Sequence, residues 1–397
     1  MMTQQEIDAA LTRKPAISWP SEPRLGSIYG QEELDAVEQS MRDSMDVVKG
    51  FGFSAPPIPD FEAAFAKYTG TKFATAVNSC GPGIDIVMRY LKLQPGDEVI
   101  VPSINYSAAP LAVLGAGGTV IWGESDPETF MLDPKDVEKK ITPRTRAIFP
   151  VHIHGCSAPM DEYIEIANRH PHPVYGPPKV IGDAARACGG DYNGTKIGKR
   201  GWATIYSFHT QKNMTTLGEG GMIVTDDEDL NTYAHSVRMY GGGVNAWGTS
   251  NVMTKVQAAV GLVQLAKLDS FIAGRRRVAY ARNRMLEGVE GITLPYNPPN
   301  AESSFYMYPI KLKSEWAGEK RDYIIATLRD KYNVGAVVAN NPAYMGRKIL
   351  ADHFGKTTPL SEKLASQLIC LSIHPAMSDS DNEYITAAFL SCLKELD

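Results

Sequence analysis

Cysteine is scarce in this chain of 397 residues, and its few cysteines follow no pattern. They are Cys80, Cys156, Cys188, Cys370 and Cys392. An odd, scattered set without a Cys-x-x-Cys pair favours neither a disulfide framework nor a zinc site. We therefore expect reduced thiols and a cytoplasmic location.

Long apolar runs and an excess of positive charge are also missing. No run reaches the roughly 18 residues of a membrane span, and the first residues, MMTQQEIDAALTRKP, are too polar for a signal peptide. The net charge is −5 at pH 7, so no basic stripe is expected to neutralise nucleic-acid phosphates. We expect neither a membrane nor a nucleic acid as a partner.

Several binding and catalytic motifs are absent as well. The chain has no P-loop, nucleophile elbow, His-Glu-x-x-His motif or dinucleotide fingerprint, and GAGG at residues 115–118 is too short to count. No spacing places the clustered histidines on one strand or helix face with a carboxylate; these are His152, His154, His170 and His172. We expect no metal site.

What the chain does contain is a regular alternation of strands and helices. The strand-like runs are residues 73–77, 98–101, 119–122, 147–151, 179–182, 203–208 and 221–225. Helical stretches separate many of them, which is typical of an α/β fold with a mostly parallel sheet. The last strands are too close together for crossover helices, so we expect part of the sheet to be antiparallel.

The pattern predicts three regions. Residues 1–30 form an arm with several prolines and little periodicity, and helical spacing begins at Gln31. A large α/β domain covers residues 31–265, and a long apolar helix begins near Val256. Beyond it the rhythm changes, and residues 266–397 are predicted to form a smaller α+β domain.

One pair of residues indicates chemistry. Apolar residues run into Asp183 in VIGDAARACGG, which places it at the carboxyl end of a core strand, where open α/β sheets bind ligands. An aspartate there can instead cap the next helix. Lys212 follows the next strand in SFHTQKNMTTLGEGG, and a lone loop lysine is usually solvated. Together, however, the two match pyridoxal 5′-phosphate (PLP), which needs an amine for its aldehyde and an anion for its pyridine nitrogen.

Longer segments carry a family resemblance. DAARACGGDYNG, SFHTQKNMTTLGEGGMIVTDD, GDEVIVPSINYSA, ITPRTRAIFPVHIHG and TKVQAAVGLVQLAKLD resemble the DegT/DnrJ/EryC1/StrS family of sugar and cyclitol aminotransferases. The likeness runs from about Gln31 to the carboxyl terminus. It implies the PLP-dependent transferase fold type I, with a mixed, mostly parallel seven-stranded sheet between helices and a smaller C-terminal α+β domain.

The resemblance also implies residue roles. Lys212 would form a Schiff base with PLP and, once freed by substrate, would move a proton between substrate and cofactor. Asp183 would pair with the pyridinium nitrogen. Tyr106 in PSINYSA would stack on the ring, although it could also be a core tyrosine.

The cofactor phosphate would be held at the start of a helix. Ser207 would donate a hydrogen bond, and the helix after NSCGPG would offer free amides and its dipole. The family often has Thr-Ala where this chain has Gly81-Pro82, and proline donates no N–H. The contacts are therefore expected from the Cys80 or Gly81 amides, with Ser79 as a further candidate.

Two further departures concern Arg186 and a segment between subunits. Arg186 stands where glutamine or histidine is common, and it would either stabilise the phenolic oxygen of the cofactor or bind substrate. The segment GTSNVM, residues 248–253, is where the family reaches a neighbouring subunit's phosphate, here through Ser250 or Asn251. We expect a homodimer with shared active sites.

The predicted function is an aminotransferase that moves an amine from glutamate or glutamine to a keto-sugar or keto-cyclitol, in amino-sugar, aminocyclitol or antibiotic biosynthesis. Candidate rim elements are residues 49–53, His154, 240–251 and 340–344. One alternative is a PLP/PMP-dependent sugar dehydratase of the same family, in which histidine replaces the lysine. The other is a catalytically idle sensor or scaffold. Lys212 argues against the first, and the Asp183–Lys212 pair against the second.

Overall fold

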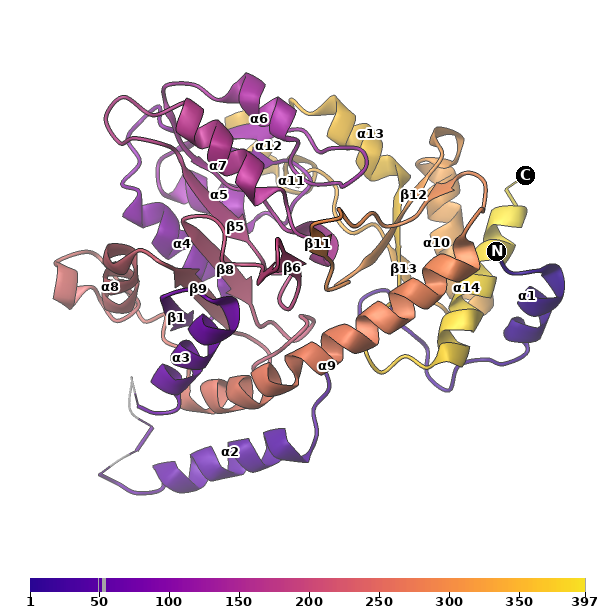
Figure 1. Ribbon diagram of the computed structural model, residues 1–397, viewed down its shortest axis with the longest axis horizontal. Coiled ribbons are helices and arrows are strands. Elements are labelled where there is room, and N and C mark those ends of the chain that lie inside the picture. Colours follow the sequence, from indigo (N-terminus) through magenta and orange to yellow (C-terminus); the bar gives the residue numbers. More distant parts are fainter. Residues whose placement is uncertain (49, 52–54, 397) are drawn as a thin grey trace.

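A computed structural model describes residues 1–48, 50–51 and 55–396 of the chain. At its centre lies a seven-stranded sheet in the order β1-β9-β8-β5-β4-β2-β3 (Figure 1). The strands are β1 (Phe73–Val77), β2 (Glu98–Pro102), β3 (Thr119–Gly123), β4 (Thr145–Ile148), β5 (Lys179–Asp183), β8 (Ala203–Ser207) and β9 (Gly221–Thr225). Strand β9 is antiparallel to both neighbours, and the other pairs are parallel. The prediction of a mixed, mostly parallel sheet is confirmed.

Helices cover both faces of this sheet. Successive strand residues alternate between two apolar cores, so Ile205 belongs to one core and Tyr206 to the other. Burial on both faces is typical of parallel sheets with helical crossovers. The helices around the sheet are α3 (Ile58–Thr69), α4 (Cys80–Tyr90), α5 (Ala108–Gly115), α6 (Pro134–Lys140), α7 (Met160–Arg169) and α8 (Glu228–Val237).

Helix α9 (Lys255–Leu286) runs from the sheet region to the C-terminal part of the chain (Figure 1). It is long and apolar enough to cross a membrane, but half of its most apolar window is buried inside the protein. The buried side chains of Arg275 and Arg282 also lie on it, so it has the character of a core helix. Residue 265 lies within α9, and the domain boundary placed there stays a prediction.

A second, antiparallel sheet follows α9, in the order β10-β12-β14-β13. It packs with two helices around a separate core that contains Ile310, Ile385 and Phe389. The elements are β10 (Ile292–Thr293), β12 (Tyr308–Leu312), α10 (Glu319–Tyr332), β13 (Ala336–Val337), β14 (Leu368–Leu371) and α14 (Asp379–Lys394). Both helices and antiparallel strands therefore follow α9.

Other short elements join the two parts. The helices α11 (Ala343–Gly346) and α12 (Lys348–Phe354) contribute Tyr344 and Leu350 to a core of the large sheet. A three-stranded sheet pairs β6 (Asp191–Tyr192) with β7 (Thr195–Lys196) and with β11 (Ala301–Glu302). The remaining elements are α13 (Pro359–Gln367), η1 (Ile153–Gly155), η2 (Gly242–Val244) and η3 (Ser314–Trp316).

The N-terminal region contains more regular structure than its periodicity predicts. Helix α1 (Gln4–Leu11) begins at a capping box made by Thr3 and Glu6, and it lies beside α14 (Figure 1). Ile7 and Ala10 join the C-terminal core. Because α1 is short and buries few residues, its apolar pattern is too weak to stand out in the sequence.

Helix α2 (Gln31–Ser44) follows and lies against α9 at the edge of the molecule (Figure 1). Its buried Glu33 accepts hydrogen bonds from Gln264 at 2.8 Å and Lys267 at 3.0 Å. A polar face of α2 therefore packs inward, and its apolar face is exposed.

Candidate active site

Asp183 is the last residue of β5, at the carboxyl end of the sheet. It is 6% exposed, and its Oδ1 accepts a hydrogen bond from the Ala185 amide at 2.9 Å. Burial raises the pKa of its carboxyl group, while this amide and then the charges of Lys212 and Arg186 act in the opposite direction. A buried carboxylate is thus available to a cationic ligand group.

Lys212 lies in the turn between β8 and β9. The turn is held by hydrogen bonds such as that from the Lys212 amide to the His209 carbonyl oxygen at 2.8 Å, and Gly218 adopts a φ of +110°. Burial, and then the nearby charge of Arg186, lower the pKa of the Lys212 ammonium to about 8. A lysine of this kind is a nucleophilic amine near neutral pH, as Schiff-base chemistry requires.

The start of α4 forms an anion cradle beside these two residues. Within the described chain, Ser79 precedes the helix without capping its amides, and its hydroxyl instead donates to Glu219 at 3.0 Å. Nothing lies within 4 Å of a Cβ built on Gly81, so the space in front of these amides is open. Free amides and the helix dipole favour a phosphate at this place.

Strand β9 approaches the same helix start very closely. A Cβ on Gly221 would lie 2.7 Å from the Ser79 carbonyl carbon and 2.8 Å from the Cys80 nitrogen. Ser207 pairs with Gly221 in the sheet and is buried. Because residue 221 is a glycine, β9 and its partner residue Ser207 can lie close to the first residues of α4. Ser207 and the start of α4 can therefore contact the same anion.

The thiol of Cys80 belongs to this cradle. Burial, and then the charge of Asp183, raise its pKa well above the ordinary value. The group stays a neutral thiol, so it adds no negative charge next to a bound phosphate.

These residues fit PLP. The cradle with its open space suits a phosphate, Lys212 supplies an amine of lowered pKa, and Asp183 supplies the carboxylate for a ring nitrogen. The structure brings Cys80, Asp183 and Lys212 close enough to influence one another's pKa.

Other predicted residues lie around this centre. Tyr106 follows β2 and is 61% exposed, which leaves its ring free for a ligand. The Asn251 amide donates to the Arg238 carbonyl oxygen, and the Asn251 carbonyl accepts from Asn78, each at 2.9 Å. Ser250 is exposed and forms a bridge with Met239. The roles of Tyr106, Ser250 and Asn251 stay predictions.

The segments expected to form the rim of the pocket differ in how exposed their side chains are. Residues 49, 52 and 53 lie outside the described residues. His154 is 4% exposed, and burial and then the charge of Arg186 lower the pKa of its imidazole to about 3. In the 240–251 loop, Tyr240 and Trp247 are about as exposed as Tyr106.

In the expected rim segment 340–344, Asn340 contacts the site. Arg186 donates a hydrogen bond to Asn340 Oδ1 at 2.5 Å. Tyr344 does not form the rim, because its ring is buried in the core beside Trp122. The apolar contact with the tryptophan holds it there, and its hydroxyl is bonded to Thr358 and Glu362.

The sequence analysis did not identify Tyr306 and Glu22 as site residues. Tyr306 contacts Lys212, and Glu22 contacts Tyr306. The Nζ of Lys212 lies 3.5 Å from the hydroxyl oxygen of Tyr306, and that hydroxyl donates a hydrogen bond to Glu22. They come from opposite ends of the chain, and neither belongs to a motif. The polar segment WPSEPRLG before α2 gave no periodic signal by which Glu22 could be found.

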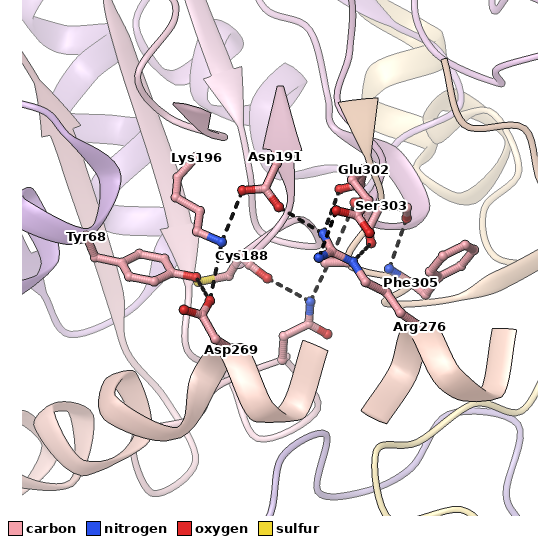
Figure 2. A network of polar contacts seen from close by, with 12 residues as sticks. Tyr68, Cys188, Asp191, Lys196, Asp269, Arg276, Glu302, Ser303 and Phe305 are labelled. Carbon is pink, nitrogen blue, oxygen red and sulfur yellow. Dashed lines mark hydrogen bonds and ion pairs between the residues drawn. The ribbon is translucent and has the colours of Figure 1, made fainter. Parts of the chain in front are cut away.

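Figure 2 shows a network of polar contacts between α9, the three-stranded sheet and the segment before Tyr306. This network reaches Asn213, the residue after Lys212. The Asn213 amide group donates to the Cys188 carbonyl oxygen and to the Ser304 hydroxyl, each at 3.0 Å. Nearby, Arg276 of α9 pairs with Asp191 at 2.9 Å and with Glu302 at 3.1 Å. The small sheet, α9 and the segment before Tyr306 are thereby tied to the residue after Lys212.

The four clustered histidines lie in different surroundings. His152 and His154 are buried, whereas His170 pairs with Glu138 at 2.7 Å and His172 accepts from the Val174 amide at 3.0 Å. Among the described residues, no group of three His, Cys, Asp or Glu side chains is arranged to hold a metal ion.

Comparisons with known proteins show the family of this chain. The model of the DegT/DnrJ/EryC1/StrS aminotransferase family matches residues 29–390. The chain is 35% identical over 348 residues to dTDP-3-amino-3,4,6-trideoxy-alpha-D-glucose transaminase of Streptomyces venezuelae, covering 86% of this chain and 87% of that protein. It is 34% identical over 341 residues to GDP-perosamine synthase of Caulobacter vibrioides, covering 83% and 88%.

Solved structures show the same fold. The S. venezuelae protein DesV, in complex with a ketimine intermediate, superposes with a TM-score of 0.82 at 30% identity, over 95% of this chain and 98% of its own. A putative sugar aminotransferase of Streptococcus pneumoniae in its PMP form gives 0.87 at 24% identity, over 94% and 98%. The predicted fold type, cofactor and enzyme class are confirmed. The chain thus belongs to the DegT/DnrJ/EryC1/StrS aminotransferase family, as an enzyme that uses PLP and PMP.

Proposed function

We propose that this chain transfers the amino group of glutamate or glutamine to the ketone of a sugar or cyclitol. The observation that carries the proposal is the buried Lys212, with its lowered pKa, beside Asp183 and an open anion cradle. Relatives that are a third identical are named for amino sugars linked to nucleotides. A nucleotide-linked keto-sugar is therefore the acceptor to test first, with free sugars, phosphorylated sugars and cyclitols as the other classes.

The proposed role of each site residue follows from its charge and its position. When bound, PLP withdraws electrons from the substrate carbon that carries nitrogen. Asp183 holds the proton on the ring nitrogen, and the cradle at Cys80 and Gly81 fixes the phosphate. Lys212 anchors the cofactor covalently and afterwards moves a proton at its Nζ, which its lowered pKa allows near neutral pH.

Arg186 is the proposed anchor for an anionic substrate group. Its guanidinium is held by the neutral Asn340, and among described residues it forms no ion pair with a carboxylate. A partly buried cation without a counterion, close to the reacting amine, suits the carboxylate of an amino donor. Removal of that charge is expected to raise KM for the donor more than KM for the sugar.

Two copies of the chain are proposed to form a homodimer. The apolar residues of α2 and the following turn are exposed, including Leu34 (64%), Met41 (57%), Met45 (81%), Val47 (97%) and Val48 (91%). An apolar stripe of this kind marks a protein interface. A second copy fits it, because shared sites are expected from segment 248–253.

The defining experiment follows nitrogen from donor to acceptor. Protein reconstituted with PLP is expected to absorb in the visible, to lose that band when glutamate or glutamine is added, and to regain it with a keto-sugar. Mass spectrometry of the sugar, with 15N-labelled donor, identifies the product. In Lys212→Ala, both the band and the transfer are expected to vanish.

The alternatives give other outcomes. A dehydratase would bleach without passing 15N to a ketone, and a sensor would keep its band in the presence of every donor. If Lys212→Ala still transferred nitrogen at the wild-type rate, the proposal would be wrong. Lys363→Ala, at an exposed lysine, serves as the matched control.

A further inference from the structure

The N-terminal segment of residues 20–29 lies along the turn that carries Lys212. The Gly26 amide donates to the Thr210 carbonyl oxygen, and the Thr210 hydroxyl donates to the Arg24 carbonyl oxygen, each at 2.8 Å. A Cβ on Gly26 would lie 2.0 Å from the Gln211 carbonyl oxygen. The segment therefore touches the backbone of the lysine turn directly.

Further contacts fix the register of this segment. The Tyr29 hydroxyl is 2.6 Å from the Thr215 hydroxyl and accepts from the Leu217 amide at 3.0 Å. The buried Arg275 donates to the Gly26 carbonyl oxygen at 2.6 Å. The Ser372 hydroxyl donates to the Pro20 carbonyl oxygen at 2.7 Å, so hydrogen bonds hold the chain on both sides of Glu22.

Glu22 uses that position to accept a hydrogen bond from Tyr306. The tyrosine is 5% exposed, and its Oη lies 3.5 Å from Lys212 Nζ. Burial, and also the charge of Glu22, raise the pKa of the Tyr306 phenol, so the phenol keeps its proton. Since the O–H donates to Glu22, the oxygen is left to accept an N–H from Lys212.

The place of Tyr306 is fixed as well. The preceding Phe305 has a φ of +47°, and its amide donates to the Ser303 hydroxyl at 2.9 Å. The Ser304 hydroxyl accepts a hydrogen bond from Asn213, the residue after the lysine, at 3.0 Å. The tyrosine and the lysine are therefore positioned by one connected set of hydrogen bonds.

We infer that Glu22 and Tyr306 are positioning residues for Lys212: the carboxylate orients the phenol, and the phenol holds the ε-amine and stabilises its protonated form. The inference rests on the proposed role of Lys212. No proton passes through Tyr306, because burial raises the pKa of its phenol and the phenol stays neutral. The pair acts in the interval when Nζ, freed by substrate, carries a proton that it must deliver.

Charge supports this assignment. The Arg186 guanidinium carbon lies 5.6 Å from the centroid of the Tyr306 ring, and its charge disfavours the lysine ammonium, whereas the charge of Glu22 favours it. The N-terminal carboxylate thus limits how far the pKa of Lys212 falls.

The test measures the pKa of Lys212 in full-length, cofactor-free protein. Acetic anhydride acetylates the free amine, and peptide mass spectrometry gives the rate at Lys212 across pH. We expect a midpoint near 8 in the wild type. Glu22→Gln is expected to lower the midpoint by about one unit, the lower end of the effect of a charge about 4–6 Å away.

Tyr306→Phe is expected to lower the midpoint too, because the acceptor for the N–H is lost. In the Tyr306→Phe background, Glu22→Gln should then have a smaller effect, since nothing holds the carboxylate at the site. In the loaded enzyme, both variants should lower kcat more than they change KM for either substrate.

Two control variants separate positioning from general loosening of the fold. Asp35→Asn removes a negative charge from the exposed face of α2, and Tyr323→Phe removes an exposed hydroxyl that donates to Glu395 at 3.0 Å, away from the N-terminal segment and Lys212. Both should keep the wild-type midpoint. The inference is overturned if Glu22→Gln leaves the midpoint unchanged, or if either control shifts it equally.

Failure of the proposed function is distinguishable from this outcome. Loss of the visible band in Lys212→Ala tests the lysine's covalent role, whereas the acetylation midpoints need no cofactor. A retained band would refute the proposed function whatever the midpoints show.

Discussion

A lysine buried beside an arginine is costly to keep protonated, and Lys212 is such a residue. Its pKa of about 8 in the folded protein lies below the ordinary value of 10.5. The folded state therefore binds fewer protons than the unfolded state between these pH values, and folding stability rises with pH across that window. Below pH 8 the full cost of burying the charge is present.

Lys212→Met is accordingly expected to stabilise the cofactor-free protein at pH 7 by about 3 kcal/mol. The gain should shrink between pH 8 and pH 10.5, where the wild-type lysine loses its charge on its own. Urea unfolding at several pH values measures the difference. Lys363→Met, at an exposed lysine, should show no such gain; a gain that is independent of pH would contradict the assigned pKa.

Asp183 works through its charge, and so its amide counterpart is the informative variant. Asp183→Asn keeps the acceptor for the Ala185 amide but loses the partner of the ring nitrogen. Nitrogen transfer is expected to slow by a factor on the order of 10²–10³, while thermal unfolding stays near that of the wild type. A single-turnover assay with glutamate checks this, and a near-native rate would mean that another residue faces the ring nitrogen.

At the scale of elements, the site depends on how closely β9 passes the start of α4. The approach leaves no room for a side chain at Gly221. The cradle therefore exists because a glycine stands at the first residue of a buried strand, where glycine is otherwise unfavourable.

Gly221→Ala is expected to push the strand away from Ser79 and Cys80. Overpacking of this kind costs about 1–3 kcal/mol, and the shifted amides should bind the phosphate group of PLP more weakly. Urea unfolding and a titration with PLP followed by absorption measure both effects. Gly115→Ala, at a helical glycine with nothing within 4 Å of its Cβ, is the control; it should leave PLP binding unchanged and should not lower stability. Unaltered cofactor affinity in Gly221→Ala would contradict the cradle.

At the scale of the whole molecule, α2 presents its apolar residues outward. Helical spacing predicted this helix and its apolar positions, yet the polar Glu33 faces α9 instead. An arrangement of this kind is stable in water only if something covers the apolar face. The proposed partner is a second copy of the chain.

The double variant Met41→Glu/Met45→Glu should weaken the dimer, because charges would face the interface. Analytical ultracentrifugation measures the shift toward monomer. Leu360→Glu, at an exposed apolar residue on α13, should leave the oligomeric state unchanged. A wild-type protein that is monomeric throughout would refute the interface.

Sharing of sites is tested by mixing. A Lys212→Ala chain combined with a chain altered at Ser250 and Asn251 should regain part of the activity that neither has alone. No recovery, under conditions in which mixed dimers form, would count against a site built from two chains.

The sequence by itself determined the sheet, the family and the cofactor, and it singled out Asp183 and Lys212 as the proposed cofactor residues. Strand and helix periodicity is local, so the strands of the large sheet were predicted within a few residues of their bounds. Asp183 and Lys212 could be recognised because one ends a strand and the other lies in the turn after the neighbouring strand, and parallel neighbours bring their carboxyl ends together. The enzyme class and cofactor followed from that pair and from the motifs around it.

Only the tertiary structure decided which residues face Lys212 and which surfaces are buried. Glu22 and Tyr306 are separated by most of the chain, and no local pattern links them; hydrogen bonds across the fold bring them to the lysine. Tyr344 looked like a rim residue but packs in the core, and α2 turned its apolar face outward. Periodicity shows that a face exists, whereas packing against distant segments decides where that face points.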